Sequence, residues 1–529
     1  MRVTNKMIMN NAASNINSTK EIVKQRNTQM TSQKKIDRPS DDPVVAVRSL
    51  RLSTTLSQVT QYYSRNIPDA TSWLEVTETS LINIGDLVRD CRTLADKGAT
   101  GSLNEEDRNT IVTQMQALQK QVFAEGNADY AKRTVFTGYR TGKNLVFTED
   151  TKTEPADQVT RYTITQTLTM EDNMEEHRYY NGVTAVPTTE DELKLTGNIN
   201  DMAQTNYYRL RLNYNELESL NEIVITSKDP NITTDSFNLI TFDNETAWAA
   251  YSETDDTTTP PTVIKEGNTK TVPDNAIYVI KETGDVILGN QVAATLKENE
   301  ASLDITYTKA SFKEGELRPE YYHNCVKTAD PEDVQVPVTY KKFNDDGTTI
   351  HFDIEYTIAA NQTIAINTEA SDVFNSDIQR DLSEMMDAVK NSIAAHNKLK
   401  DIERMQGEVQ YQSDEDQELL SQWYDAIKKE ADYFDDNIKK LFNTELGKMD
   451  TYYAKIYLGI TDLGCKRDSL NLTKTRVGDQ RETVQSLQST NDDVDLSQII
   501  IDYTAAYTAY QASLTAAGKL GDSTLLNYI

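Results

Sequence analysis

The 529-residue sequence is poor in cysteine. Its three cysteines, Cys91, Cys325 and Cys465, are odd in number and far apart. Both a disulfide framework and a zinc site need more closely organised cysteines, so neither is expected. We interpret Cys91 and Cys465 as small apolar residues of the core.

Histidine is also scarce, and none of the four histidines belongs to a His-Glu-x-x-His pair, the usual mark of a zinc hydrolase. His351 alternates with the residues of an expected strand, and we interpret it as a β-sheet side chain rather than a ligand. The segment from Gly138 to Asn144 resembles a phosphate-binding loop, but it is one residue short between its glycines and lacks the Ser or Thr that holds magnesium. A turn is the better interpretation. We expect no catalytic residue, metal ligand or cofactor.

Basic residues are also few relative to acidic ones. Lysine and arginine total 54 against 83 acidic residues, which gives a net charge of −29. We therefore expect neither nucleic acids nor anionic membranes as partners, because binding them requires basic side chains. No run of 18 apolar residues occurs, so no membrane span is expected. Residues 1–11 lack the apolar block of a cleaved secretory signal.

What the sequence does contain is helical periodicity at both ends and a different pattern between them. The predicted fold is mainly α with an all-β insertion. Its parts are terminal coiled-coil helices at 1–42 and 490–529, a long-helix bundle domain at 43–147 and 371–489, and a β-rich domain at 148–370.

One repeating apolar pattern indicates a very long helix, and we call the line of buried side chains that such a pattern predicts a seam. From Ile67 to Ala95, apolar residues recur at alternating steps of three and four, as in a coiled-coil bundle. Asp42 is placed to cap the helix and Pro43 suits its first position, since the missing N–H would be unpaired there. This interpretation explains Asp41-Asp42 better than a catalytic carboxylate pair does. Pro68 removes one helical hydrogen bond and is expected to kink the rod.

The C-terminal half has similar signals. Apolar residues recur every seven positions from Ile456 to Val484, which we call the α-helical heptad repeat of this region. Other apolar patterns predict helices around 378–393 and 419–434. The segment 491–493 interrupts the pattern, and a final helix follows it.

The two extreme ends carry seams of their own. The residues expected to pack against other helices are Met9, Ile16, Val23 and Met30 at the N-terminus, and Ile500, Tyr503, Tyr507, Tyr510, Leu514, Leu525 and Leu526 at the C-terminus. Residues 1–35 hold seven basic side chains against one acidic, and residues 484–529 hold five Asp against one Lys. Opposite charges make the two ends natural partners, but a two-helix contact is thin. Further copies of the chain are therefore expected to complete it.

In the middle region, Thr alternates with apolar residues from Tyr162 to Met170, which is the period of a strand. Further strands are predicted at 276–280, 285–288, 303–308, 334–340 and 349–358. Thr283-Gly284-Asp285 and Asp346-Gly347 predict hairpin turns.

Several short motifs together resemble the flagellin superfamily. They are Met1-Arg2-Val3-Thr4, Pro39-Ser40-Asp41-Asp42-Pro43, Asn66-Ile67 with Asp69-Ala70, Val135-Phe136-Thr137-Gly138, Leu463-Gly464, 489–495, and the terminus from Leu525 to Ile529. Filament flagellins usually have Asp-Asp-Ala-Ala-Gly where this chain has Asp-Asp-Pro-Val-Val, and they end differently. The sequence therefore resembles the members that join hook to filament. Ala365-Ile366-Asn367 with Val373-Phe374 also looks like their return from the outer domain.

The resemblance implies a structural axial protein of the bacterial flagellum, with the β-rich domain outermost. It also implies extracellular location, export through the flagellar type III apparatus without a cleaved signal, and assembly as a ring of copies of this chain. The implied partners are hook-associated protein 1, flagellin and an export chaperone. Two alternatives stay open: a filament flagellin, and an extracellular adhesin or hydrolase acting through residues 148–370.

Overall fold

The computed structural model describes residues 5–100, 104–152, 159–180, 182–183, 185–200, 204–255, 262–265, 267, 269–331 and 336–522. These residues form two compact units. Unit 1 comprises Met1–Ser72, Glu355–Ile364 and Lys466–Ile529, and unit 2 comprises Trp73–Ile354 and Ala365–Cys465.

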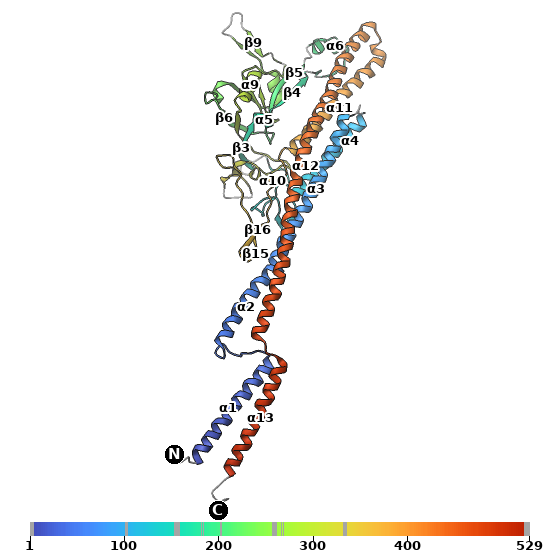
Figure 1. The fold of residues 1–529 in the computed structure, drawn as a ribbon. Helices are drawn as coiled ribbons and strands as arrows, with labels where there is room; N and C mark the ends of the chain where they lie inside the picture. Colours follow the sequence, from blue (N-terminus) through green and yellow to red (C-terminus); the bar gives the residue numbers. More distant parts are fainter. Residues whose placement is uncertain are drawn as a thin grey trace, which may run out of the picture. The chain divides into compact units, whose positions relative to one another are not determined.

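Long helices make up both ends of the chain (Figure 1). They are α1 (Asn5–Ser32), α2 (Pro43–Gln61), α3 (Ile67–Thr100), α4 (Glu105–Gly126), α11 (Ile378–Gly407), α12 (Asp414–Asp492) and α13 (Leu496–Asp522). The predicted seam of α3 is confirmed, because its members from Ile67 to Ala95 are at most 1% exposed. The heptad of α12 from Ile456 to Val484 is likewise buried.

A π-helical turn, η1 (Tyr62–Asn66), links α2 to α3 just before Pro68. The Ile67 N–H donates to the Tyr62 carbonyl, five residues back. Pro68 has no N–H to give to Ser64, and its ring would crowd that carbonyl in a regular α-helix. The wider π turn accommodates both effects, so the disturbance that we predicted at Pro68 takes this form.

In unit 2, α3 and α12 pack antiparallel along their buried seams. Gly85 of α3 lies against Ile456, and seven residues further along Arg92 donates to both carboxylate oxygens of Asp450, at 2.6 and 3.2 Å. The sequence predicted separate helices around 419–434 and 456–484. The structure instead forms one helix of 79 residues, about 120 Å long.

The β-rich part of unit 2 contains two five-stranded sheets. The first has the order β14-β13-β3-β12-β6, formed by β3 (Arg161–Thr169), β6 (Ser219–Thr226), β12 (Ser302–Lys309), β13 (Asn324–Ala329) and β14 (Val338–Tyr340). The second has the order β4-β5-β11-β10-β7, formed by β4 (Glu175–Tyr180), β5 (Gln204–Arg211), β7 (Asn238–Phe242), β10 (Ala276–Ile280) and β11 (Asp285–Leu288). All pairs are antiparallel except β10 with β7.

One hydrophobic core joins these two sheets. It contains Tyr162 and Ile305 of the first sheet and Ile277 and Val286 of the second. The strands predicted at 276–280 and 285–288 are confirmed, with Gly284 at a φ of +70° in the turn between them. Short helices complete the region: α5 (Met170–Asn173), α6 (Glu190–Leu193), α7 (Gly197–Asn200), α8 (Glu245–Ala250), α9 (Asn290–Glu298) and α10 (Ala370–Val373).

Three small hairpins add to the sheets. They are β1 (Asp129–Tyr130) with β2 (Arg133–Thr134), β8 (Glu253–Asp255) with β9 (Thr262–Lys265), and β15 (Glu355–Ala359) with β16 (Gln362–Ala365). The strand predicted at 349–358 begins only at Glu355. The β15 strand lies in unit 1 beside η1, where Asn66 Nδ2 donates to the Thr357 carbonyl at 2.7 Å and Tyr356 donates to Asp69.

Candidate assembly surfaces

The two terminal helices, α1 and α13, lie side by side in unit 1 (Figure 1). Of the N-terminal seam, Ile16, Val23 and Met30 are half-buried, whereas Met9 is 56% exposed. A single neighbouring helix covers only one stripe of a helix surface, so partial burial is what a two-helix contact provides. The contact between α1 and α13 therefore leaves apolar surface uncovered.

The C-terminal seam divides into two stripes. Tyr503 and Tyr510 are half-buried, whereas Ile500, Tyr507 and Leu514 are 48%, 43% and 44% exposed. Ile500, Tyr507 and Leu514 are spaced by seven residues, so they share one face of the helix. We call these three residues the outer stripe of α13. Our prediction placed all five residues on one seam, but the structure puts only two of them in partly buried positions.

Small and apolar side chains adjoin the outer stripe and form a shallow groove along α13. Its lining residues are Ile500, Ile501, Thr504, Ala505, Thr508, Ala509 and Ala512. Ile501 is 62% exposed. Small residues allow a second helix to approach closely, so this face has the shape of a helix-packing surface. Leu525 and Leu526, which were also predicted to pack, lie outside the described residues.

Backbone hydrogen bonds join the segment that follows α1 to the segment that precedes α13. Lys35 N–H donates to the Asp492 carbonyl at 2.8 Å, and Val494 N–H donates to the Gln33 carbonyl at 3.0 Å. Lys34 Nζ forms an ion pair with Asp493 at 2.5 Å. Hydrogen bonds from Lys34 and Ser489 lower the pKa of the Asp493 carboxyl. The opposite charges of the two ends thus meet at this crossing.

The same crossing supports the start of α2. Asp42 is its N-cap, and its carboxylate accepts hydrogen bonds from the N–H groups of Val44 at 2.9 Å and Val45 at 3.2 Å. Pro43 occupies the first turn. Asp492 accepts a hydrogen bond from the Ser49 hydroxyl at 2.9 Å. We had interpreted Asp492 as part of a break in the helical pattern and as one of the acidic residues of the C-terminal end.

Other apolar side chains of unit 1 also face solvent. Val44 and Leu50 on α2 are each 68% exposed, and Leu472 and Leu487 on α12 are 75% and 53% exposed. Isolated exposed apolar residues are common on protein surfaces. Their presence on several long helices of one unit nevertheless adds to the surface available for neighbouring chains.

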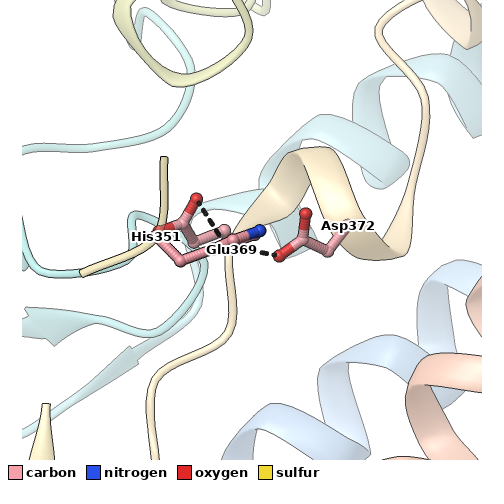
Figure 2. A group of neighbouring side chains, drawn as sticks. All are labelled: His351, Glu369 and Asp372. Atoms are coloured by element: carbon pink, nitrogen blue, oxygen red, sulfur yellow. Dashed lines mark ion pairs between the residues drawn. The ribbon is translucent and has the colours of Figure 1, made fainter. Parts of the chain in front are cut away.

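Two of our interpretations of single residues were wrong. Cys91 is buried as predicted, and burial raises the pKa of its thiol to about 12, but Cys465 is exposed on α12 rather than in the core. It follows the buried heptad residue Leu463 by two positions, which turns its side chain away from the seam. His351 is not a strand residue: it lies ahead of β15, 48% exposed, beside Glu369 and Asp372 (Figure 2).

The comparisons with known proteins agree with the motifs at the N-terminus. Residues 3–141 match the family model described as the bacterial flagellin N-terminal helical region. Over these residues the chain is similar to the flagellin family, which agrees with the resemblance inferred from its sequence.

Two curated relatives are both named flagellar hook-associated protein 3. The relative from Salmonella typhimurium is 27% identical over 143 residues, which cover 27% of this chain and 44% of the relative. The relative from Escherichia coli is 30% identical over 115 residues, which cover 21% of this chain and 36% of the relative. The chain thus spans less than half the length of the curated relatives that it matches.

Among solved structures, hook-associated protein 3 from Legionella pneumophila aligns with 83% of this chain and 97% of its own chain. The identity is 11% and the TM-score is 0.29, which is too weak to support a functional inference. Within the described part of the chain, every helix falls short of the length and apolar character that crossing a bilayer requires.

Proposed function

We propose that this chain is a structural axial protein of the bacterial flagellum that forms the junction between hook and filament, and that it has no catalytic role. The outer stripe of α13 carries the proposal. Ile500, Tyr507 and Leu514 repeat along one helix face and remain 43–48% exposed after α1 has packed against α13. The names of the two curated relatives support the same assignment.

The energetic argument concerns the number of chains. Full burial of a large apolar side chain contributes about 1.5–3 kcal/mol, so a half-exposed one retains roughly 1 kcal/mol for a further partner. Ile500, Tyr507 and Leu514 together offer only about 3 kcal/mol, less than the translational and rotational entropy lost in pairing two chains. Assembly is therefore expected to be favourable only where each chain meets several neighbours. A closed ring of copies meets this condition, because every member is flanked on both sides.

The proposed partners follow from this location. The chain would contact further copies of itself within the ring, hook-associated protein 1 on the hook side and flagellin on the filament side. It would be extracellular, exported through the flagellar type III apparatus without a cleaved signal. Before export, an exposed apolar helix needs protection, so we expect a flagellar export chaperone to bind residues 484–529. Failure of this segment to co-purify any flagellar chaperone from the producing cell would contradict the chaperone assignment alone.

Electron microscopy after deletion of the gene tests the junction role. Loss of a junction protein should leave hooks without filaments while intact flagellin is released into the medium. Loss of a filament flagellin should also leave bare hooks, but with no free subunit of the missing protein. A deletion strain that still carries normal filaments on its hooks would contradict both assignments.

A further inference from the structure

Three side chains from two separate segments of unit 2, those of His351, Glu369 and Asp372, lie close together. Asn367 holds the segments together: its amide donates to the Phe352 carbonyl at 2.9 Å and accepts from Ile354 N–H at 2.8 Å. His351 is thereby placed beside the chain that carries Glu369 and Asp372 (Figure 2).

Glu369 is fixed independently from its other side. It pairs with Thr137 in an isolated β-bridge, and the next residue, Ala370, donates its N–H to the Phe136 carbonyl at 2.8 Å. Asp372 follows on the short helix α10, where its N–H donates to the Glu369 carbonyl at 3.0 Å. The backbone on both sides of the cluster is therefore held before any ligand arrives.

The potential ligand atoms are close to metal-binding distances. His351 Nδ1 lies 3.7 Å from Glu369 Oε2 and 3.6 Å from Asp372 Oδ2, and the three ligand atoms all lie within 4.8 Å of one another. A tetrahedral ion with bonds of about 2.1 Å separates its ligand atoms by roughly 3.4 Å. Small side-chain rotations would bring the three atoms onto one ion.

We propose that His351, Glu369 and Asp372 bind a divalent transition-metal ion, with Zn²⁺ preferred. One imidazole nitrogen and two carboxylate oxygens form a ligand set that zinc accepts, whereas Mg²⁺ and Ca²⁺ favour oxygen ligands alone. His351 and Asp372 are 48% and 43% exposed at the side chain, so the ion can enter and complete its coordination with water. Bound there, it would join the segment before β15 to α10.

Lys342 is a cation that competes for Glu369. Its ammonium group forms an ion pair with Glu369 Oε2, the same oxygen that faces His351, and its side chain is only 6% exposed. A carboxylate oxygen has two lone pairs, so the lysine and the metal can share it. The lysine charge nevertheless repels a divalent ion, and removing that charge should tighten metal binding.

The test is calorimetric titration of ZnCl₂ into the purified full-length chain. We expect one strong site per chain and a melting temperature that rises with added zinc. His351→Ala and Asp372→Asn should each weaken zinc binding at least about tenfold, because loss of a ligand exceeds the effect of losing a supporting hydrogen bond. Lys342→Met should bind about tenfold more tightly.

Two matched variants control for adventitious binding. His177→Ala removes another histidine of unit 2, and Asp387→Asn removes an exposed carboxylate on α11, so both should bind zinc as the unaltered chain does. Far-ultraviolet circular dichroism checks that each variant keeps its helices. Equal affinity of His351→Ala and the unaltered chain, absence of a one-to-one site, or weaker binding by Lys342→Met would overturn the proposal.

Discussion

Charged side chains are buried around residue Glu445 of α12, which is 1% exposed. Burial and the neighbouring charge of Asp381 raise the pKa of its carboxyl from 4.5 to about 8, although Lys448 at 3.0 Å opposes the shift. The folded chain therefore keeps a proton on Glu445 that the unfolded chain releases above pH 4.5. The stability that this group contributes is complete below pH 4.5 and is lost as the pH rises through about 8.

The variant Glu445→Gln isolates the contribution of this carboxyl group to the pH dependence of stability. The free energy of unfolding should fall by up to about 1.4 kcal/mol per pH unit between pH 6.5 and 8 in the unaltered chain, and the fall should be absent in the variant. Urea unfolding at several pH values measures both slopes. Burial lowers the pKa of His323 to about 4, so its own contribution changes below pH 6.5 and leaves the chosen window clear. Equal slopes in the two proteins would contradict the assignment to Glu445.

The Asp42 cap is a second effect of a single residue. Asp42→Ala removes the acceptor for the Val44 and Val45 N–H groups, which the helix itself cannot satisfy. We expect a loss of about 1 kcal/mol in the free energy of unfolding, measured by urea denaturation. Asp42→Asn keeps an acceptor oxygen and should lose much less. A urea unfolding curve unchanged by Asp42→Ala would show that the cap does not contribute to stability.

At the scale of elements, an ionic cluster attaches the strand β5 to the helix α11. Glu384 accepts hydrogen bonds from Arg209 Nη2 at 2.7 Å and Arg211 Nη1 at 2.6 Å. Burial alone would raise the pKa of Glu384, but the two arginine charges outweigh it and hold that pKa well below its usual value. The carboxylate therefore stays charged between two buried cations.

Glu384→Ala should weaken this attachment strongly. It leaves Arg209 and Arg211 with less compensation for their burial, so we expect a loss of about 3 kcal/mol in the free energy of unfolding. Hydrogen exchange should increase first in β5 and the facing turns of α11. Asp387→Ala, three residues away and exposed, should change stability by less than about 0.5 kcal/mol. Similar effects of both variants would show that the ion pairs are not specific.

The helices were the most predictable elements. The α3 seam and the α12 heptad could be identified because a repeat of three and four residues is local and specifies a buried face. The boundaries of the strands were less predictable from the sequence. Val338–Tyr340 and Glu355–Ala359 are shorter than predicted, because pairing partners rather than local alternation decide where a strand begins. In α12, Asp435 lies between the two predicted helices and contacts distant segments: it pairs with Arg108 of α4 at 2.8 Å and accepts a hydrogen bond from Ser392 of α11 at 2.6 Å.

For the whole molecule, substitutions in the terminal helices provide a separate test of assembly. Ile500→Asp combined with Leu514→Asp places charge on the outer stripe of α13, where both side chains are nearly half-exposed. The monomer should unfold at nearly the same urea concentration, but charge in the buried interface between copies should prevent junction formation. Cells carrying only the double variant should release flagellin into the medium as the deletion strain does.

Gln511→Asp is the matched control for this experiment, because Gln511 is an exposed polar residue of the same helix. It should support normal filaments. Normal filaments in cells that carry only the Ile500→Asp, Leu514→Asp variant would instead show that the outer stripe is not an assembly surface, whatever the junction role of the chain.

Local patterns in the sequence were enough to predict the resemblance to the flagellin family, the long helices at both ends, the Asp42 cap and the β-rich middle. Each of these depends on neighbours within a few residues, such as Asp42 before Pro43 or the seven-residue spacing from Ile456 to Val484. The half-burial of Tyr503, the exposure of Tyr507 and the proximity of His351 to Glu369 and Asp372 became evident only from the folded chain. Those placements depend on contacts between segments distant in the chain, which periodicity does not encode.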